Sequence, residues 1–173
     1  MKKINLPLTK QEISTLKCGD CVSISGTILT ARDCAHKRIF ELLDAKKELP
    51  FEIKDSVIYY AGPCPAKPDI ISGSCGPTTS SRMNIYAPRL LDLGLGAIIG
   101  KGEMSDDVRD AIKRNKSVYF AAIGGAGALY ASCIKRSECI AFDDMLSEAV
   151  YKLEVKDFPV IVAYDSFGGS IYG

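Results

Sequence analysis

Two kinds of apolar periodicity alternate along this chain, and this alternation restricts the possible folds more than any other feature. Short β-branched or continuously apolar runs, typical of strands, stand between segments whose apolar residues repeat at helical spacing. We expect strands over residues 22–30, 56–61, 97–99 and 118–123, and helices over residues 33–46, 105–115 and from 127 onward. This order of elements predicts a layered α/β domain with a mixed sheet.

Three local patterns add further expectations. Asp33 is expected to cap the helix that follows it. Gly76-Pro77 is predicted to start a helix directly at Thr78, and Pro88 is predicted to kink or break that helix. Residues 150–155 and 160–164 are predicted as a pair of closing strands around Asp157-Phe158-Pro159. With 173 residues, of which 47% are hydrophobic and 25% charged, we expect one folded domain over residues 1–173.

The charge balance and the apolar stretches exclude several classes of protein. The chain has 22 Lys and Arg against 21 Asp and Glu, a net charge of +1. This balance argues against broad electrostatic binding to nucleic acid or to a membrane surface. The first residues lack the apolar core of a signal peptide, and the longest mostly apolar stretch, residues 119–131, is too short to span a bilayer. We therefore expect a cytoplasmic protein.

Seven cysteines are scattered along the chain without the compact spacing of a metal site. Cys18 and Cys21 form a CxxC pair, but no second pair follows and the only histidine is His36. We interpret this CxxC as incidental rather than as a redox or metal site, and we expect no metal ligand in this chain. Cys75 directly precedes a Gly-Pro-Thr segment, so its thiol could approach a site formed there.

Two glycine-rich segments resemble nucleotide-binding loops but do not match their patterns. In residues 94–102, Leu95 stands where a P-loop needs its first glycine, and Gly102 replaces the Ser or Thr that would hold magnesium. Residues 124–127 do not complete the G-x-G-x-x-G spacing of a dinucleotide fingerprint, because no glycine stands at its third position. We therefore predict no nucleotide site in either segment.

The strongest candidate site is the segment Gly76-Pro77-Thr78-Thr79-Ser80-Ser81-Arg82. On a helix, Thr78 and Arg82 would be four residues apart and would face the same side. Free N–H groups, the positive end of the helix and a guanidinium would then form a receptor for a carboxylate or a phosphate. An ordinary Thr/Ser helix cap beside an exposed arginine explains the spacing equally well.

Further polar residues stand where predicted strands end. Arg32 and His36 follow the first predicted strand, and Lys101 follows the strand that ends at residue 99. Ligands bind at strand ends in α/β sheets, so convergence of Arg32, Arg82 and Lys101 would create a site for a dianion such as a dicarboxylate. Each residue taken alone has a simpler explanation: Arg32 could pair with Asp33, a lysine between glycines is commonly solvated, and a single histidine is usually structural.

Several blocks of sequence, in order along nearly the whole chain, resemble one known family. They are Ser25-Gly26-Thr27, Ala31-Arg32-Asp33-Cys34-Ala35-His36, Tyr60-Ala61-Gly62-Pro63, Gly76-Pro77-Thr78-Thr79-Ser80-Ser81-Arg82-Met83, Gly100-Lys101-Gly102 and Lys152-Leu153-Glu154-Val155-Lys156-Asp157-Phe158-Pro159. The Arg-Asp-x-x-His and Gly-Pro-Thr-Thr-x-x-Arg-Met blocks are specific in combination. The chain resembles the β subunit, or carboxy-terminal domain, of the iron–sulfur hydro-lyases, which include class I fumarase and L-tartrate dehydratase.

This resemblance implies a swivelling β/β/α domain that takes part in the reversible hydration of fumarate to L-malate, a step of the tricarboxylic acid cycle. An L-tartrate dehydratase β subunit is the alternative, and a non-catalytic dicarboxylate-binding module is a third hypothesis. In the family, a 4Fe–4S cluster is held by cysteines of the partner α subunit and offers one open iron as a Lewis acid. The resemblance thus implies an obligate α subunit and a plausible α2β2 assembly. The surface of residues 124–130 is one candidate contact, although a buried helix is the simpler explanation.

The resemblance also assigns roles to individual residues. Three cations are implied as substrate ligands: Arg32, Arg82 and Lys101. Thr78 is the candidate base that takes the proton from the carbon next to the carboxylate. Because a threonine hydroxyl is a weak base, nearby cations must favour its alkoxide. His36 is a second acid/base candidate or an orienting residue, and Asp33 is expected to orient Arg32 or His36.

Overall fold

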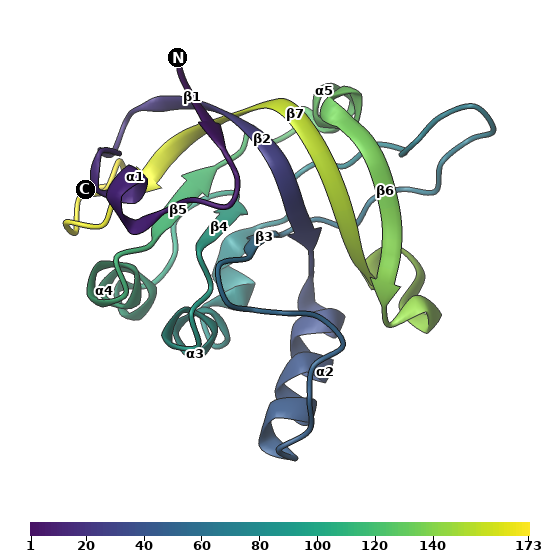
Figure 1. Cartoon of the computed structure of the whole chain (residues 1–173), viewed down its shortest axis with the longest axis horizontal. Coiled ribbons are helices and arrows are strands. Elements are labelled where there is room, and N and C mark those ends of the chain that lie inside the picture. Colours follow the sequence, from purple (N-terminus) through teal and green to yellow (C-terminus); the bar gives the residue numbers. More distant parts are fainter.

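A mixed sheet forms the centre of the computed structural model, which describes all 173 residues (Figure 1). Its seven strands have the order β1-β2-β3-β4-β5-β7-β6, and β2 also pairs with β7. The strands are β1 (Lys2–Asn5), β2 (Cys21–Thr30), β3 (Val57–Tyr59), β4 (Ala97–Gly100), β5 (Val118–Ala121), β6 (Ile134–Ala141) and β7 (Val150–Tyr164). The predicted α/β class with a mixed sheet is confirmed.

Strand β7 closes this sheet on itself. Strands β1 to β5 run parallel to their neighbours, whereas β7 runs antiparallel to both β2 and β5. Five of the strands therefore form a closed ring, in the order β2, β3, β4, β5 and β7. Outside this ring, β1 pairs with β2 and β6 pairs with β7. The closure depends on pairs such as Val22 with Val160, which lie too far apart in the sequence for a local pattern to predict.

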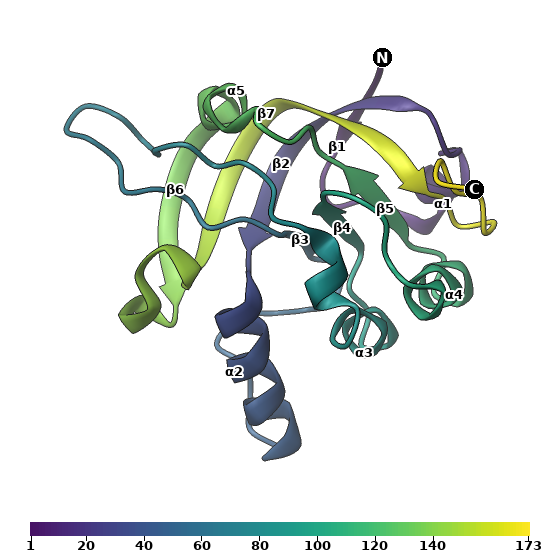
Figure 2. The same cartoon turned by 180° about the vertical axis from the view of Figure 1, so that it is seen from behind.

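Two apolar cores fill the inside of the ring and the space under its helices. In β4, Ala97 and Ile99 belong to the interior core, whereas Ile98 belongs to the core under the helices, as expected for alternating strand residues. Figure 2 shows helices α2 (Asp33–Asp44), α3 (Ala87–Asp92) and α4 (Asp106–Arg114) together on one side of the sheet. The short helices α1 (Lys10–Ser14) and α5 (Gly127–Cys133) contribute instead to the interior core.

Most predicted elements are present, and the chain end is the main exception. The expected strands correspond to β2, β3, β4 and β5, and the expected helices to α2, α4 and α5. The closing strand pair was wrong, because β7 runs without a break through Asp157 and Pro159. Asp157 has a left-handed φ of 53°, and the register with β2 shifts between Ile24 and Gly26. The turn-like residues are therefore accommodated as a bulge within one strand.

Some elements were not predicted at all. In strands β1 and β6, helix α1 and the 3-10 helix η2 (Asp143–Glu148), half or more of the residues are exposed and the apolar patterns are weak. Residues 124–130 were expected to form either a contact surface or a buried helix, and the structure shows some of each. Tyr130 of α5 is buried, whereas Ile123 and Leu129 are about half exposed. None of the helices has both the length and the apolar character needed to cross a bilayer.

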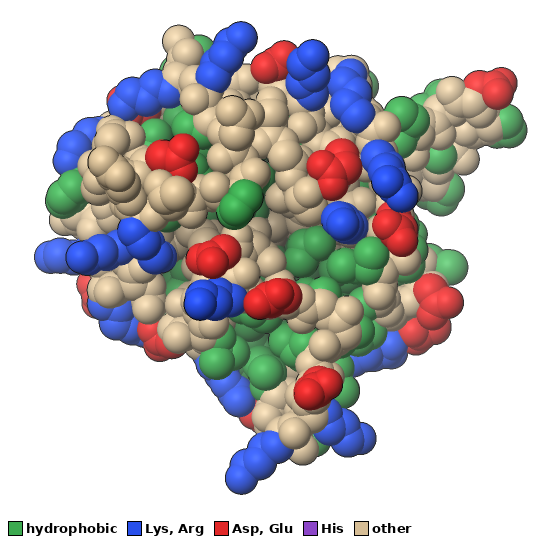
Figure 3. Space-filling model, in the orientation of Figure 1, with side chains coloured by type: hydrophobic (Ala, Val, Ile, Leu, Met, Phe, Trp, Pro, Cys, Tyr) green, Lys and Arg blue, Asp and Glu red, His purple; other side chains and the backbone are tan.

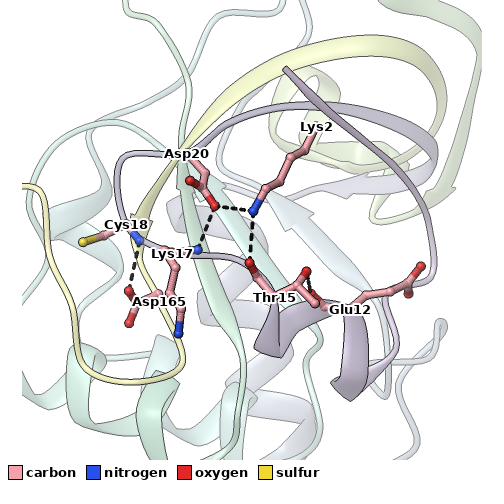
Figure 4. A network of polar contacts seen from close by, with 7 residues as sticks. All are labelled: Lys2, Glu12, Thr15, Lys17, Cys18, Asp20 and Asp165. Atoms are coloured by element: carbon pink, nitrogen blue, oxygen red, sulfur yellow. Dashed lines mark hydrogen bonds and ion pairs between the residues drawn. The ribbon is translucent and has the colours of Figure 1, made fainter.

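A polar network joins the segment before β2 to the segment after β7, at one end of the ring (Figure 4). Asp165, just after β7, is buried, and its carboxylate accepts the backbone N–H groups of Cys18, Phe167 and Gly169 at 2.8–3.0 Å. Burial alone would raise the pKa of this carboxyl, but the three donors outweigh burial and hold the pKa below its usual value. Asp20 completes the network through a 2.7 Å ion pair with the Lys2 ammonium.

We expect Asp165→Ala to lower the free energy of unfolding by about 1–3 kcal/mol at pH 7, because three backbone donors lose their acceptor. The folded-state pKa is depressed, so this stabilisation is present above the unfolded pKa of about 3.9 and is lost as the pH falls through the folded value. Urea unfolding at pH 7 and pH 3 should show the difference between variant and wild type shrinking in acid. Asp20→Ala is the control, because it removes an exposed ion pair and one backbone hydrogen bond, against three for Asp165; an equal loss in that variant would contradict the prediction.

Candidate active site

The carboxyl ends of four parallel strands bring most of the predicted site residues to one edge of the ring. Arg32 follows β2, Gly62 lies shortly after β3, Lys101 follows β4, and Gly124 lies shortly after β5. Because β2 to β5 are consecutive parallel neighbours, these positions lie in a row. The sheet order thus places Arg32 and Lys101 at the same edge, as their positions at strand ends predicted.

The segment around Thr78 continues this edge as extended chain. The backbone N–H of Thr78 donates to the carbonyl of Tyr60 at 2.7 Å, and that of Ser80 donates to the carbonyl of Lys101 at 2.9 Å. Thr79 and Lys101 form an isolated parallel bridge. Helical turns begin only at Ser80, in the 3-10 helix η1 (Ser80–Met83). The predicted helix start at Thr78 was wrong, because the backbone donors of this segment pair with neighbouring strands instead.

This correction removes the predicted anion receptor at a helix N-terminus. Thr78 precedes η1 and Arg82 lies within it, so the two residues do not share the first turn of one helix. The predicted break near Pro88 is confirmed, since α3 starts separately at Ala87 with the proline in its first turn. Any anion at this edge must therefore be bound by side chains from several segments.

Arg32 is a cation without a partner in this chain. Its side chain is partly buried, makes no ion pair, and leaves Nε enclosed without a hydrogen-bond partner. It lies against Gly62, where an added Cβ would come 2.9 Å from Arg32 Cδ and 3.2 Å from Nη1. Glycine at position 62 thus provides the space for the arginine side chain.

Lys101 is the second unpaired cation. Its side chain is partly buried and lies over Gly124, where an added Cβ would come 3.0 Å from Lys101 Cδ. Its backbone N–H donates to Ser80 Oγ at 2.8 Å. The Tyr119 hydroxyl lies 2.9 Å from Ser80 Oγ and 2.7 Å from the carbonyl oxygen of Gly102. Sequence reasoning missed Ser80 and Tyr119, because nothing local distinguishes this serine from its neighbouring hydroxyl residues.

Asp33 pairs with Arg82 rather than with the residues predicted for it. Arg82 Nε lies 3.1 Å from Asp33 Oδ1, and both side chains remain partly exposed. The expectation that Asp33 orients Arg32 or His36 was therefore wrong. Asp33 is also the first residue of α2 rather than its cap, a position that Arg32 occupies. An exposed ion pair of this kind is weak, so Arg82 remains available to an anion.

His36 lies in the first turn of α2 and is fully buried. Its Nδ1 lies 2.7 Å from the carbonyl oxygen of Arg32, so Nδ1 carries the hydrogen in this contact. The His36 ring centroid is 5.4 Å from those of both Tyr60 and Tyr86. Burial lowers the pKa of His36 to about 4. The ring is therefore neutral at pH 7 and shielded from solvent, which favours an orienting role over acid/base work.

The cysteines of this chain do not fit an iron–sulfur cluster of their own. All seven thiols are free, and nowhere do three His, Cys, Asp or Glu side chains gather as a metal site. The Cys75 thiol, which the sequence left free to approach the site, lies fully buried in the interior core, and burial raises its pKa to about 12. It is therefore an inert thiol.

A hollow with apolar lining lies away from these residues. On the face shown in Figure 3, hydrophobic side chains gather above α2. There a hollow of about 330 Å³ is lined by residues such as Leu29, Phe51 and Val57, and by none of the predicted site residues. The side chains of Arg32, Thr78, Arg82 and Lys101 line none of the five main hollows, so we call the edge that carries them the open edge.

Two unpaired cations, Arg32 and Lys101, thus lie with Thr78 at the strand ends of a closed α/β sheet. The sequence model described as Fumarase C-terminus matches residues 1–173, and the chain belongs to this family. The resemblance inferred from the sequence blocks is confirmed.

Three relatives show how the chain compares with whole proteins. It is 44% identical over 171 residues to a Methanocaldococcus jannaschii protein provisionally named L(+)-tartrate dehydratase subunit beta, covering 95% of this chain and 88% of that protein. It is 41% identical to the anaerobic class I fumarate hydratase of Escherichia coli, over 99% of this chain and 31% of that protein. It is 40% identical to fumarate hydratase 2 of Leishmania major, covering 94% and 29%. The chain thus spans about a third of these fumarate hydratases.

Proposed function

We propose that this chain is the β subunit of an iron–sulfur hydro-lyase that reversibly hydrates fumarate to L-malate together with an α subunit. The observation that carries the proposal is the pair of unpaired cations, Arg32 and Lys101, beside Thr78 at an open sheet edge. A dicarboxylate dianion suits these cations, with Arg82 as a third whose only partner is a weakly held carboxylate. Residues 1–173 act in this proposal as one domain.

Thr78 is the proposed base. Its backbone is fixed by the Tyr60 carbonyl, while its partly buried side chain is left free to face the substrate. In the dehydration direction, Thr78 takes the proton from the carbon next to a carboxylate, and the electron pair left behind delocalises into that carboxylate. Arg32 and Lys101 stabilise this developing charge and favour the threonine alkoxide. The double bond then forms as hydroxide leaves the adjacent carbon.

The open edge and the scattered cysteines support an obligate partner. A 4Fe–4S cluster on the α subunit would supply the Lewis acid for the substrate hydroxyl. The α subunit would also provide the missing wall of the site, and an α2β2 assembly would satisfy two-fold symmetry. Seven free thiols suit a reducing compartment, which supports a cytoplasmic location.

An L-tartrate dehydratase β subunit is the second candidate. The relative named as such a subunit is covered over 88% of its length, whereas the fumarate hydratases are covered over about 30%. The two candidates share the same cations and base. They differ in how the site receives the second hydroxyl group of tartrate.

The proposal predicts that neither subunit alone turns over substrate. The chain should be co-expressed with the α subunit of a neighbouring gene, and the cluster reconstituted without oxygen. Turnover of fumarate, L-malate and tartrate is then compared for the complex and for each chain alone. Fumarate hydration that needs both chains supports the first candidate, and tartrate dehydration without fumarate turnover supports the second. A cluster-loaded complex with no turnover would leave a dicarboxylate-binding module as the better account.

A further inference from the structure

Three buried side-chain nitrogen or oxygen atoms lack a hydrogen-bond partner, and all three lie near the sheet edge that carries Arg32 and Lys101. They are Arg32 Nε, His36 Nε2 and Tyr60 Oη. His36 and Tyr60 are fully buried, and their rings meet edge to face with centroids 5.4 Å apart. Unpaired buried polar groups are costly and rare in folded proteins. Their concentration beneath Arg32 indicates a functional requirement at this position rather than a packing defect.

His36 holds the main chain of Arg32. The Arg32 carbonyl accepts both the backbone N–H of His36 at 3.0 Å and the ring Nδ1–H at 2.7 Å. A neutral ring with its hydrogen on Nδ1 makes this second bond, and burial keeps the ring neutral by lowering its pKa to about 4. Arg32 is thereby fixed at its backbone, while its side chain extends along Gly62 toward the open edge.

Tyr60 connects this histidine to the other two reactive segments. Its carbonyl accepts the Thr78 N–H at 2.7 Å, and its own N–H donates to the Ile99 carbonyl at 2.9 Å. Its ring packs against Gly100, where an added Cβ would come 3.0 Å from Tyr60 Cδ2. Since Gly100 directly precedes Lys101, Tyr60 contacts both the segment with the proposed base and the strand end with the second cation.

We infer that His36 and Tyr60 form a buried positioning pair that sets the places of Arg32, Thr78 and Lys101 relative to one another. The inference rests on the proposed function, because it concerns geometry for a dicarboxylate substrate. Neither ring touches the substrate: His36 acts through the Arg32 carbonyl, and Tyr60 acts through its own carbonyl and through Gly100. The pair also explains why a histidine follows Arg32 by one helical turn, the spacing that lets its ring reach that carbonyl.

Matched variants of the α–β complex test the role of each ring. His36→Leu and Tyr60→Leu should lower kcat/KM about 10- to 100-fold, the usual range for residues that orient ligands from behind. Asn places an amide N–H close to the histidine Nδ1, so His36→Asn should recover most of this loss. Tyr60→Phe, which keeps the ring and its packing, should lose less than Tyr60→Leu. A His36→Asn variant as inactive as His36→Leu would overturn the positioning role and favour acid/base work.

A stability control separates positioning from simple destabilisation. Ile112→Ala removes buried volume from the same core, under α4 and away from the edge. It should lower the thermal unfolding temperature as His36→Leu does but leave kcat/KM unchanged. If Ile112→Ala lowers kcat/KM equally, the effects of the ring variants reflect stability and the inference fails.

A measurement on the chain by itself keeps this inference separate from the proposed function. The chain contains one histidine, so its ring nitrogen signals in a ¹⁵N NMR spectrum need no assignment. Between pH 5.5 and 8 they should show a neutral ring with hydrogen on Nδ1. Titration near the ordinary pKa of about 6.5, or hydrogen on Nε2, would overturn the inference whatever the activity of the complex. An inactive complex combined with the expected spectrum would instead count against the proposed function.

Discussion

Thr78→Val in the α–β complex is expected to lower kcat about 10²- to 10⁴-fold, the range for removing a general base, with little change in KM. Valine has nearly the same shape as threonine but no hydroxyl group to take a proton. The backbone N–H of residue 78 still bonds to the Tyr60 carbonyl, so the extended segment keeps its place. The cations that bind the dicarboxylate are also unchanged. Steady-state rates with fumarate and with L-malate measure both constants.

The neighbouring threonine provides a matched control. Thr79 carries the same side chain one position further on, is exposed, and lies in the bridge with Lys101. Thr79→Val should leave kcat and KM close to the wild-type values. If both variants lose activity equally, the segment is merely sensitive to substitution. If Thr78→Val keeps most of its turnover, Thr78 is not the base. A non-catalytic binding module would show unchanged anion affinity in both variants.

The ends of strands were the most predictable part of this site. Periodicity alone indicated β2 and β4, and strands of an α/β sheet present their carboxyl ends together. Arg32 and Lys101 could therefore be expected at one edge before the pairing of the strands was known. This prediction was correct because neighbouring parallel strands end at the same edge of a sheet, whichever side chains are in contact.

Contacts between distant segments were beyond the reach of local patterns. Gly76-Pro77 favours a helix start, but the N–H groups of Thr78 and Ser80 found carbonyl partners on neighbouring strand ends instead. The pairing of Asp33 with Arg82 joins residues 49 positions apart, so sequence proximity to Arg32 was misleading. In each case a tertiary partner outweighed a local preference.

Tyr60 shows why positioning residues are harder to find than ligands. It follows Tyr59 in the same apolar run, so residue type alone does not distinguish the two tyrosines. The pleat separates them, because Tyr59 faces the interior core and Tyr60 faces the core under the helices, next to His36. Sequence blocks can identify Arg32 or Lys101 by charge, whereas the role of Tyr60 depends on which face of the strand it occupies.

Arg32→Met is expected to lower kcat/KM about 10²- to 10³-fold, corresponding to about 3–4 kcal/mol for a partly buried charged contact. The loss should be larger than for Arg82→Met. Arg32 has no partner in the chain and is held in place by Gly62 and by the His36 contact at its carbonyl, so its guanidinium is preorganised for a carboxylate. Arg82 is about half exposed and must first leave Asp33. Michaelis–Menten measurements on both variants compare the two cations.

Two further variants decide how the arginines share the substrate. Arg89→Met removes a guanidinium that pairs with Asp44 on the helical side of the molecule, and it should leave kcat/KM unchanged. Asp33→Asn frees Arg82 from its ion pair, and it should lower KM if Arg82 reaches the substrate by leaving Asp33. A greater loss for Arg82→Met than for Arg32→Met would contradict the ranking. It would mean that substrate binding opens the Asp33–Arg82 pair and that the exposed guanidinium, rather than the preorganised one, carries most of the binding energy.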